Sequence, residues 1–275
     1  MKKWLYCLLA LLMILPMGVH AENAEDGSLQ YILDNGELVL GFDPGFPPMG
    51  FQNEDGEYEG FDLDLAYAVC DILGVELELQ PIDWAAKELE LNAKNIDCIW
   101  NGFTKTPERD AALSLSMPYM ANEQVLVVKA DSPYQTLDDL AGTILGVQAG
   151  SSAVDALNDA EAFKASLGDV VEFDMNTFLL MDLDKGGVDV ALLDVIMAGY
   201  LMSINEEMDC RILEEALAPE EFAIGFRKGE TALTEAVNNA LIELAFNGVM
   251  EEISIEWFTV DITTVAGQVA MAEEH

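Results

Sequence analysis

Hydrophobic and polar positions repeat along this chain with two periods, one typical of buried strands and the other typical of helices that cover a sheet. Short apolar runs between polar or glycine residues predict strands, and apolar residues three or four positions apart predict helices. The predicted strands are 37–42, 75–81, 98–100, 123–129, 144–147, 170–173, 188–193 and 221–226. The predicted helices are 62–73, 87–93, 153–165, 177–185, 196–204, 231–247 and 249–257. This alternation of strands with helices predicts an α/β fold with parallel strands.

Some stretches lack either period. Residues 43–51 are too rich in proline and glycine for a regular element, and residues 53–60 are interpreted as a turn. Residues 265–275 carry no strong pattern, so we expect them to be frayed. Residues 125–217 repeat the strand and helix order of the part before them without obvious sequence identity, which indicates two units of similar architecture.

The most informative stretch is 96–119, where a strand, a glycine turn and a helix start follow one another closely. Residues 101–104 (NGFT) predict a turn after the strand, and Thr106 followed by Pro107 predicts the N-cap and first position of a helix. Open α/β sheets bind ligands where a strand ends beside a helix start. Arg109 lies in this helix start and its guanidinium suits a carboxylate, so we predict that an anionic group binds here.

The charge balance is strongly acidic, with 12 Lys and Arg against 51 Asp and Glu and a net charge of −39. No basic stripe is present to neutralise phosphates, which argues against nucleic acid and against anionic lipid surfaces as partners. We interpret the acidity as solubility in a saline or exposed environment. Apolar residues make up 51% of the chain, which is enough for a folded core in one large domain or two of ordinary size.

The N-terminal residues 1–21 have the features of a cleaved secretory signal peptide. Lys2 and Lys3 precede an apolar run, and Ala21 is a small residue at the expected cleavage site. Cys7 lies inside the apolar run and not at a cleavage site, so a lipid anchor is not expected. The rest of the chain has no apolar, uncharged stretch of about 18 residues, which is what a membrane helix needs. We therefore expect an exported protein that is not anchored to a membrane.

The cysteines and histidines exclude several kinds of site. Cys70, Cys98 and Cys210 lie outside the signal peptide, at no metal-ligand spacing; buried free thiols are expected, although one disulfide is possible. His20 lies in the signal peptide and His275 is the last residue. A folded body without histidine excludes Ser-His-Asp and Cys-His catalysis and His-ligated zinc. We expect no catalytic residues, no metal and no cofactor.

Several motifs occur in an order and at spacings that resemble one known family. They are GFD (41–43), FPPMGF (46–51), GFDLDL (60–65), NGFT (101–104), PER (107–109), SMPY (116–119), GVQAGSS (146–152), GVD (187–189), ALLD (191–194) and IGFRKG (224–229). Together they cover roughly residues 29–260. In this set the chain resembles the polar amino-acid-binding proteins of ABC importers, which are periplasmic solute-binding proteins of family 3.

The resemblance implies a two-lobed periplasmic-binding-protein fold of type II. Each lobe is then a mixed, mainly parallel sheet flanked by helices, and the ligand binds in the interlobe cleft. The first lobe is expected to comprise residues 29–121 and 222–262, and the second lobe residues 125–217. The two crossings between the lobes, near 121–124 and 218–222, are expected to act as hinges that close the lobes on the ligand.

For the head group of an amino acid the resemblance implies two opposite charges. Arg109 is expected to bind the α-carboxylate, with the backbone amides of Thr104 and Ser152 as further donors. Asp194, at the end of a predicted buried strand, is expected to bind the α-ammonium. The alternatives are a surface ion pair for Arg109 and a helix N-cap for Asp194. Further acceptors for the ammonium would be the backbone carbonyls of Asn101 and Gly102.

For the ligand side chain the resemblance implies aromatic walls and a polar end. Phe46 and Trp84 match positions where the family holds the ligand side chain between aromatic rings, and ordinary core positions are the alternative. Asp43 and Gln148 are expected to face the far end of the ligand. The neutral amide of Gln148 disfavours an acidic ligand, and Asp43 favours a cation or an amide. Arginine, lysine, glutamine, cystine and small polar amino acids all stay open.

The predicted function is that of a monomeric periplasmic receptor that binds a polar or cationic L-amino acid. It would deliver this ligand to the transmembrane permease subunits of an ABC importer. One alternative is an enzyme on the same scaffold, such as a cyclohexadienyl dehydratase-like lyase, which needs a suitably placed acid. Another is a sensor or transglycosylase module, which the lack of a transmembrane segment or further catalytic domain disfavours.

Overall fold

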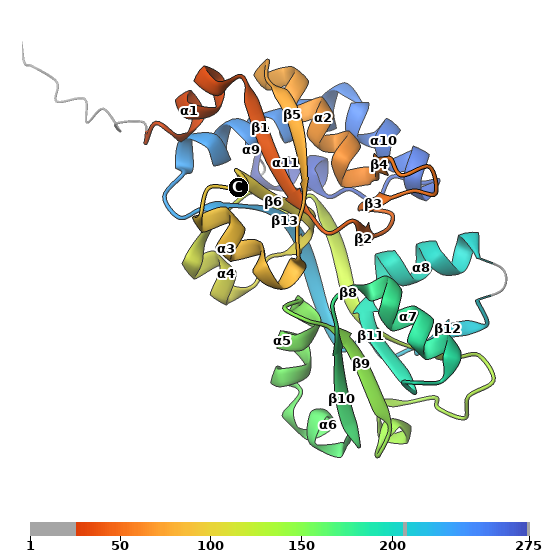
Figure 1. Ribbon diagram of the computed structural model, residues 1–275. Helices are drawn as coiled ribbons and strands as arrows, with labels where there is room; N and C mark the ends of the chain where they lie inside the picture. Colours follow the sequence, from red (N-terminus) through yellow and green to blue (C-terminus); the bar gives the residue numbers. More distant parts are fainter. Residues whose placement is uncertain (1–25, 206–207, 274–275) are drawn as a thin grey trace, which may run out of the picture.

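The structure, a computed structural model, describes residues 26–205 and 208–273. The predicted signal peptide at 1–21 and His275 lie outside the described residues. Figure 1 shows two lobes, joined where two long strands pass from one to the other.

A mixed sheet of ten strands runs through both lobes. The strands are β1 (Glu37–Phe42), β5 (Glu76–Pro81), β6 (Cys98–Thr104), β7 (Leu113–Leu115), β8 (Met120–Lys129), β9 (Ile144–Gln148), β10 (Asp169–Phe173), β11 (Val190–Asp194), β12 (Cys210–Ile212) and β13 (Ala218–Arg227). Their order is β10-β9-β11-β8-β13-β6-β1-β5, with β12 beside β8 and β7 beside β13. β1 lies parallel to β5 and β6, and β9 lies parallel to β10 and β11. The pairs that β8 and β13 make are antiparallel.

Helices cover both faces of this sheet, and a small antiparallel sheet lies beside the first lobe. The small sheet consists of β2 (Gly45–Phe46), β3 (Gly50–Gln52) and β4 (Tyr58–Glu59). The α-helices are α1 (Ser28–Asn35), α2 (Phe61–Leu73), α3 (Lys87–Asn92), α4 (Pro107–Ala112), α5 (Ser152–Asp159), α6 (Glu161–Ser166), α7 (Asn176–Lys185), α8 (Val195–Ile204), α9 (Thr231–Asn247), α10 (Val249–Phe258) and α11 (Val265–Glu273). Two short 3-10 helices are η1 (Trp84–Ala86) and η2 (Leu137–Leu140).

The strands β8 and β13 connect the two lobes. Their first halves pair with each other, from Ala218 opposite Gln124 to Phe222 opposite Met120. After this segment β8 pairs with β11 and β12, whereas β13 pairs with β6 and β7. We call the part built on β1, β5, β6 and β7 the first lobe and the part built on β9, β10, β11 and β12 the second lobe (Figure 1). The hinges predicted near 121–124 and 218–222 fall on the paired halves of β8 and β13.

The burial of side chains explains why these segments form these elements. All seven residues of β6 are buried, as expected for a strand in the middle of a sheet covered on both faces. In α2 the apolar residues recur at helical spacing, and Leu63, Ala66 and Val69 are buried. Gly74 ends this helix with φ +73°, and its N–H donates to the carbonyl of Cys70. The burial pattern follows the apolar periods of the sequence.

Most predicted elements are present, and two predictions about irregular segments are wrong. The predicted turn at 101–104 is part of β6, which continues to Thr104 because β13 pairs with it there. The backbone of β6 is irregular at Gly102, which has φ +55°. The pairing with β13 continues past this point because the register shifts between Ala223 and Gly225. The segment 43–60, expected as loop and turn, contains the small sheet, since its own strands pair with one another.

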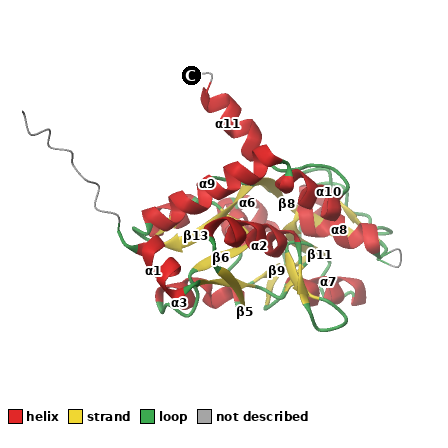
Figure 2. Cartoon of the chain, turned by 90° about the horizontal axis from the view of Figure 1, so that it is seen from above, coloured by secondary structure: helices red, strands yellow, loops and turns green. Residues whose placement is uncertain are grey.

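The prediction of a single helix at 153–165 and the prediction of a frayed end at 265–275 also need correction. The first is two helices, α5 and α6, separated at Ala160, whose ψ of 53° is not helical. Residues 265–273, expected to be frayed, form α11. Val265 is fully buried and the Gln268 side chain donates to the carbonyl of Pro118, which fixes the start of α11. Beyond its start, α11 extends away from the body of the protein (Figure 2).

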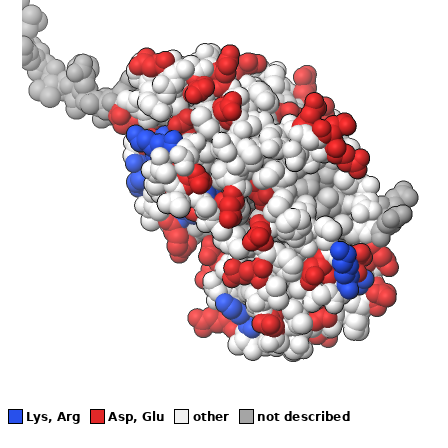
Figure 3. Space-filling view, in the orientation of Figure 1, with Lys and Arg blue, Asp and Glu red and all other residues white. Residues whose placement is uncertain are grey.

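The cysteines agree with what the sequence indicates. Cys70, Cys98 and Cys210 are buried free thiols. Within residues 26–205 and 208–273, no helix combines the length and apolarity that crossing a membrane requires. The same residues contain no cluster of three or more His, Cys, Asp or Glu that could hold a metal ion. Acidic side chains are spread over the face shown in Figure 3, and basic ones gather in a few small groups.

Candidate functional site

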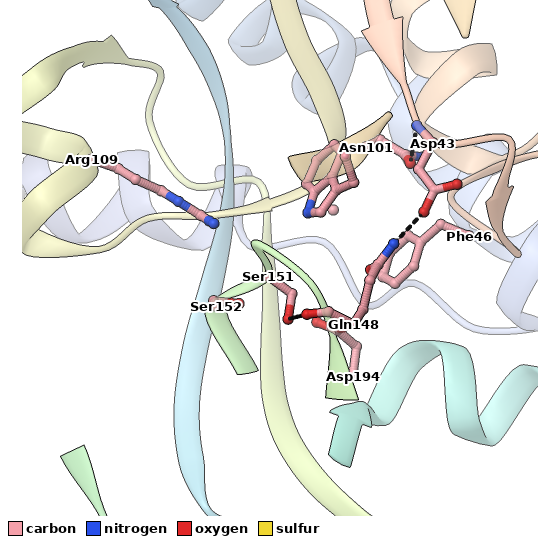
Figure 4. A pocket seen from close by; sticks show the side chains of 10 residues that line it. Asp43, Phe46, Asn101, Arg109, Gln148, Ser151, Ser152 and Asp194 are labelled. Atoms are coloured by element: carbon pink, nitrogen blue, oxygen red, sulfur yellow. Dashed lines mark hydrogen bonds between the residues drawn. The ribbon is translucent and has the colours of Figure 1, made fainter. Parts of the chain in front are cut away.

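A small cavity lined mostly by polar residues lies between the two lobes. Its volume is about 10 Å³, which is room for about one water molecule. Figure 4 shows the side chains around it, which come from strand ends and turns of both lobes. The lining residues are Asp43, Phe46, Trp84, Asn101, Gly102, Arg109, Gln148, Ser151, Ser152 and Asp194. A space for about one water molecule does not hold an amino acid, so the lining side chains must move apart before one can bind.

Arg109 provides the positive charge of the cavity. Thr106 caps α4 by accepting a hydrogen bond from the Arg109 backbone N–H (3.2 Å), and Pro107 occupies the first helical position, as predicted. The guanidinium donates through Nη1 to the carbonyl of Thr104 (2.8 Å) and lies over the ring of Phe103 at 4.3 Å. The side chain is buried, and burial lowers the pKa of this group. No carboxylate of the described residues forms an ion pair with it, so the alternative of a surface ion pair is not observed there.

Asp194 provides a carboxyl group from the opposite lobe, at the end of β11. Its carboxylate accepts hydrogen bonds from the side-chain amides of Asn122 (2.6 Å) and Gln124 (2.9 Å), both on β8. The same two amides donate to Glu220 on β13, each at 2.9 Å. Burial, and next the nearby charge of Glu220, raise the pKa of Asp194. Asp194 precedes α8 but makes no side-chain capping bond to it. The carboxylate therefore belongs to the junction of the lobes.

Asp43 and Gln148 meet across the cleft. Gln148 Nε2 donates to Asp43 Oδ2 at 2.6 Å and to the carbonyl of Asp174 at 3.1 Å (Figure 4). The amide oxygen of Gln148 accepts from Asn176 Nδ2 at 2.9 Å, which fixes the orientation of the amide. Asp43 also accepts from the Gly45 backbone N–H at 2.8 Å. Burial raises the pKa of Asp43, although these two hydrogen bonds lower it.

Two aromatic side chains form apolar walls. Phe46 lies in β2 and Trp84 in η1, and they are 6% and 7% exposed. Asp83 caps η1 by accepting from the Ala85 N–H at 3.0 Å, which sets the start of the turn that carries Trp84. The Trp84 ring meets the ring of Phe103 edge-on, with centroids 6.1 Å apart. The Phe103 ring supports Trp84 from behind, and the two apolar faces are suited to hold a ligand side chain between them.

Asn101 and Gly102 line the cavity at the irregular part of β6. The Gly102 N–H points into the first lobe and donates to Asp62 Oδ2 at 2.6 Å. Asn101 Oδ1 accepts from the Asp43 backbone N–H at 3.1 Å. A Cβ on Gly102 would lie 2.5 Å from Phe46 Cε1, so only glycine fits between the strand and the aromatic wall.

The structure brings together nine of the ten residues that the sequence indicates. Thr104 lies behind the lining, where its carbonyl accepts from Arg109 and its hydroxyl accepts from Ser152 Oγ at 3.1 Å. Its predicted role as an amide donor to the ligand is therefore untested. Ser151 also lines the cavity and was not predicted, although it stands in the same small-residue turn as Ser152. The residues around Asp194 were not predicted either, and polar positions within an apolar strand were the available signal: Asn122, Gln124 and Glu220.

Comparison with protein families decides the assignment. Residues 38–260 match the family of bacterial extracellular solute-binding proteins, family 3. The chain belongs to this family. The fold of this solute-binding protein is accordingly the two-lobed periplasmic-binding-protein fold of type II, as the motifs predicted.

Named relatives of this solute-binding protein bind amino acids. It is 31% identical to the arginine-binding extracellular protein ArtP of Bacillus subtilis over 269 residues, which is 94% of this chain and 99% of ArtP. It is 31% identical to the L-cystine-binding protein TcyJ of Escherichia coli over 242 residues, or 87% of this chain and 89% of TcyJ. A solved substrate-binding protein of an ABC uptake transporter from Streptococcus pneumoniae, with bound histidine, has 38% identity and a TM-score of 0.83. That comparison covers 87% of this chain and 99% of the solved one.

Proposed function

We propose that this solute-binding protein captures an L-amino acid between its lobes and delivers it to the permease subunits of an ABC importer. The observation that carries the proposal is the placement of Arg109 and Asp194 on one small cavity, from different lobes and not paired with each other. A guanidinium and a carboxylate placed in this way complement the two charges that every amino acid carries at neutral pH. The relatives named above, which bind arginine, cystine or histidine, share only this head group as ligands.

The charges of the lining indicate the class of ligand side chain. The cavity contains two carboxyl groups, Asp43 and Asp194, and one guanidinium, Arg109. A zwitterionic head group offsets Asp194 and Arg109 and leaves Asp43 without a charged partner. A side chain that ends in a cation, or in an amide that donates hydrogen bonds, satisfies Asp43. The aromatic faces of Phe46 and Trp84 favour a long aliphatic stem with a cationic end. We therefore propose a cationic or polar amino acid.

Binding is proposed to require motion at the hinges, because the closed cavity is too small for an amino acid. We place the hinges near 121–124 and 218–222, between a first lobe of residues 29–121 and 222–262 and a second lobe of residues 125–217. The ligand stabilises the closed state because only there can it contact groups from both lobes.

An alanine at Arg109 tests the head-group role. Arg109→Ala should abolish amino-acid binding in titration calorimetry, and Arg109→Lys should retain part of it, since charge survives but the planar fork does not. The ligand for this test comes from a thermal-shift screen of the twenty amino acids with cystine and ornithine, because bound ligand raises the melting temperature. Unchanged affinity in Arg109→Ala would contradict the role of Arg109, and a screen with no shift would contradict the proposed function.

The proposal also covers catalysis, cellular location and oligomeric state. The protein is proposed to bind its ligand without converting it, as an exported and unanchored monomer. A lyase on the same scaffold would release product from prephenate or arogenate, and liquid chromatography of that incubation distinguishes the two functions. Light scattering during gel filtration tests the monomer, and N-terminal sequencing of the exported protein tests cleavage after Ala21.

A further inference from the structure

Lys87 is a buried lysine in a chain that has few cations. It is 2% exposed and stands at the first position of α3 in the first lobe. Its ammonium donates to the carbonyl of Trp84 at 3.2 Å and, across the cleft, to the carbonyl of Gly150 at 2.7 Å. Lys87 therefore ties the backbone of an aromatic wall to a turn of the second lobe. That turn continues directly into Ser151 and Ser152 of the cavity lining.

The bond from Lys87 differs from the other hydrogen bonds that join the lobes across the cleft. In the bonds from Gln148 to Asp43 and from Ser152 to Thr104, at least one of the two bonded side chains lines the cavity. A ligand that enters competes for these polar groups. Neither Lys87 nor Gly150 lines the cavity, so ligand and Lys87 do not compete for a common partner.

The two lobes approach each other so closely at this point that the contact requires a glycine in the left-handed conformation. Gly150 has φ +67°, and a Cβ added to it would lie 3.0 Å from Ala85 Cα of the first lobe. The ammonium is therefore held in a contact between two backbone segments, and the contact exists only when the lobes are together. Lys87 also lies over the Trp84 ring at 5.1 Å.

We propose that Lys87 is a closing residue, which holds the Gly150–Ser152 turn against the first lobe and so stabilises the closed state with or without ligand. This rests on the proposed function, in which closure traps the ligand. The groups that face Lys87 come from three helices. Arg109 on α4 disfavours its charge, whereas Glu88 on α3, 3.4 Å away, and Asp155 on α5 favour it. Burial and, next, Arg109 lower the pKa of Lys87 to about 8, so the ammonium is mostly charged at neutral pH.

Two variants of Lys87 test the proposal, with L-arginine as the probe. Lys87→Met keeps the length of the side chain and removes the donor; Lys87→Arg restores a donor. The matched control is Lys129→Met, because Lys129 also donates to a backbone carbonyl, that of Asp184, but within the second lobe. Stopped-flow tryptophan fluorescence gives association and dissociation rates, and small-angle X-ray scattering of the ligand-free protein reports closure directly.

Lys87→Met should raise the dissociation rate of L-arginine by about 10-fold to 100-fold, the range for a lost hydrogen bond of a charged donor. The association rate should change by less than about threefold, since the open state lacks this bond. The ligand-free variant should have a larger radius of gyration than the wild type, Lys87→Arg should recover part of both effects, and Lys129→Met should show neither.

A dissociation rate and a radius of gyration equal to those of the wild type would overturn the proposal. So would a Lys87→Met variant that is less stable to urea but closes and releases ligand normally, because Lys87 would then act only within the first lobe. If the wild-type protein binds none of the amino acids, the proposed function fails, while the scattering comparison still decides whether Lys87 closes the lobes.

Discussion

Asp62 offers a quantitative test of how the first lobe supports the cavity. Its side chain is 0% exposed, and its Oδ2 accepts from the Gly102 N–H at 2.6 Å and from the Tyr119 hydroxyl at 3.0 Å. Burial raises the pKa of Asp62 to about 7, although these two hydrogen bonds lower it. The perturbation is Asp62→Asn, which keeps the shape of the side chain and removes the titrating carboxyl.

The magnitude follows from the two pKa values. The carboxyl has a pKa of 3.8 when exposed and about 7 when folded, so between these values the folded state binds a proton that the unfolded state does not. The free energy of unfolding therefore falls as pH rises through this window, and it is constant below and above it as far as Asp62 is concerned. Each pH unit contributes about 1.4 kcal/mol, so the full change is about 4 kcal/mol. This is a large part of the 5–15 kcal/mol that is typical of whole domains.

The assay is urea unfolding followed by tryptophan fluorescence at several pH values between about 4.5 and 8. The acidic chain has many other titrating groups, so the quantity to follow is the difference in unfolding free energy between wild type and Asp62→Asn, from which common contributions cancel. We expect this difference to shift by about 3–4 kcal/mol in favour of the variant as pH rises across this range. Asp131→Asn, at an exposed position, controls for the loss of one charge. A difference that is independent of pH would refute the reasoning.

Three further predictions follow from close contacts and charges of the structure. Gly102→Ala should lower the free energy of unfolding by about 2–4 kcal/mol in urea, because alanine disfavours φ +55° and its Cβ would lie 2.5 Å from the Phe46 ring. The control Gly142→Ala has φ +80° but open space around the new Cβ, so it should cost only about 1–2 kcal/mol. Asp43→Asn should weaken L-arginine about 10-fold or more in calorimetry and L-glutamine less; equal losses would count against a cation at Asp43. Arg227→Met should cost about 3 kcal/mol at pH 7, since the buried carboxylate of Asp97, now 3.1 Å from Arg227, loses its charged partner and keeps only the Val39 N–H as donor. A loss below about 1 kcal/mol would show that the pair is not important.

The parts of the site that could be predicted from the sequence are those with local signals. Thr106 and Pro107 specify a helix start through backbone capping that needs no distant partner, and they place Arg109 where it was expected. Asp194 follows an apolar run, and a carboxylate at the end of a buried strand lies at the edge of the sheet where ligands bind. For Arg109 and Asp194, the three or four neighbouring residues in the chain are therefore enough to predict where the side chain lies.

The features that the sequence did not reveal depend on partners far away in the chain. The continuation of β6 through Gly102 to Thr104 needs β13, more than a hundred residues later. The start of α11 is held by contacts to the first lobe and not by a strong apolar period of its own. Lys87 showed no distinctive pattern, because its role depends on a carbonyl of the other lobe. Such contacts follow from the tertiary fold, which overrides local propensity.

The closed cavity also indicates how the site discriminates between ligands. In the closed structure the Asp43 carboxylate has the Gln148 amide as its partner from the other lobe. A ligand that enters between them separates this pair and must itself supply donors to Asp43 once the lobes close. A ligand without such donors leaves a buried carboxylate unsatisfied, which costs more than the missing attraction alone. On the proposed function, selectivity at the side-chain end would therefore come from the penalty on apolar and acidic amino acids, and Arg109 and Asp194 would bind the head group that all of them share.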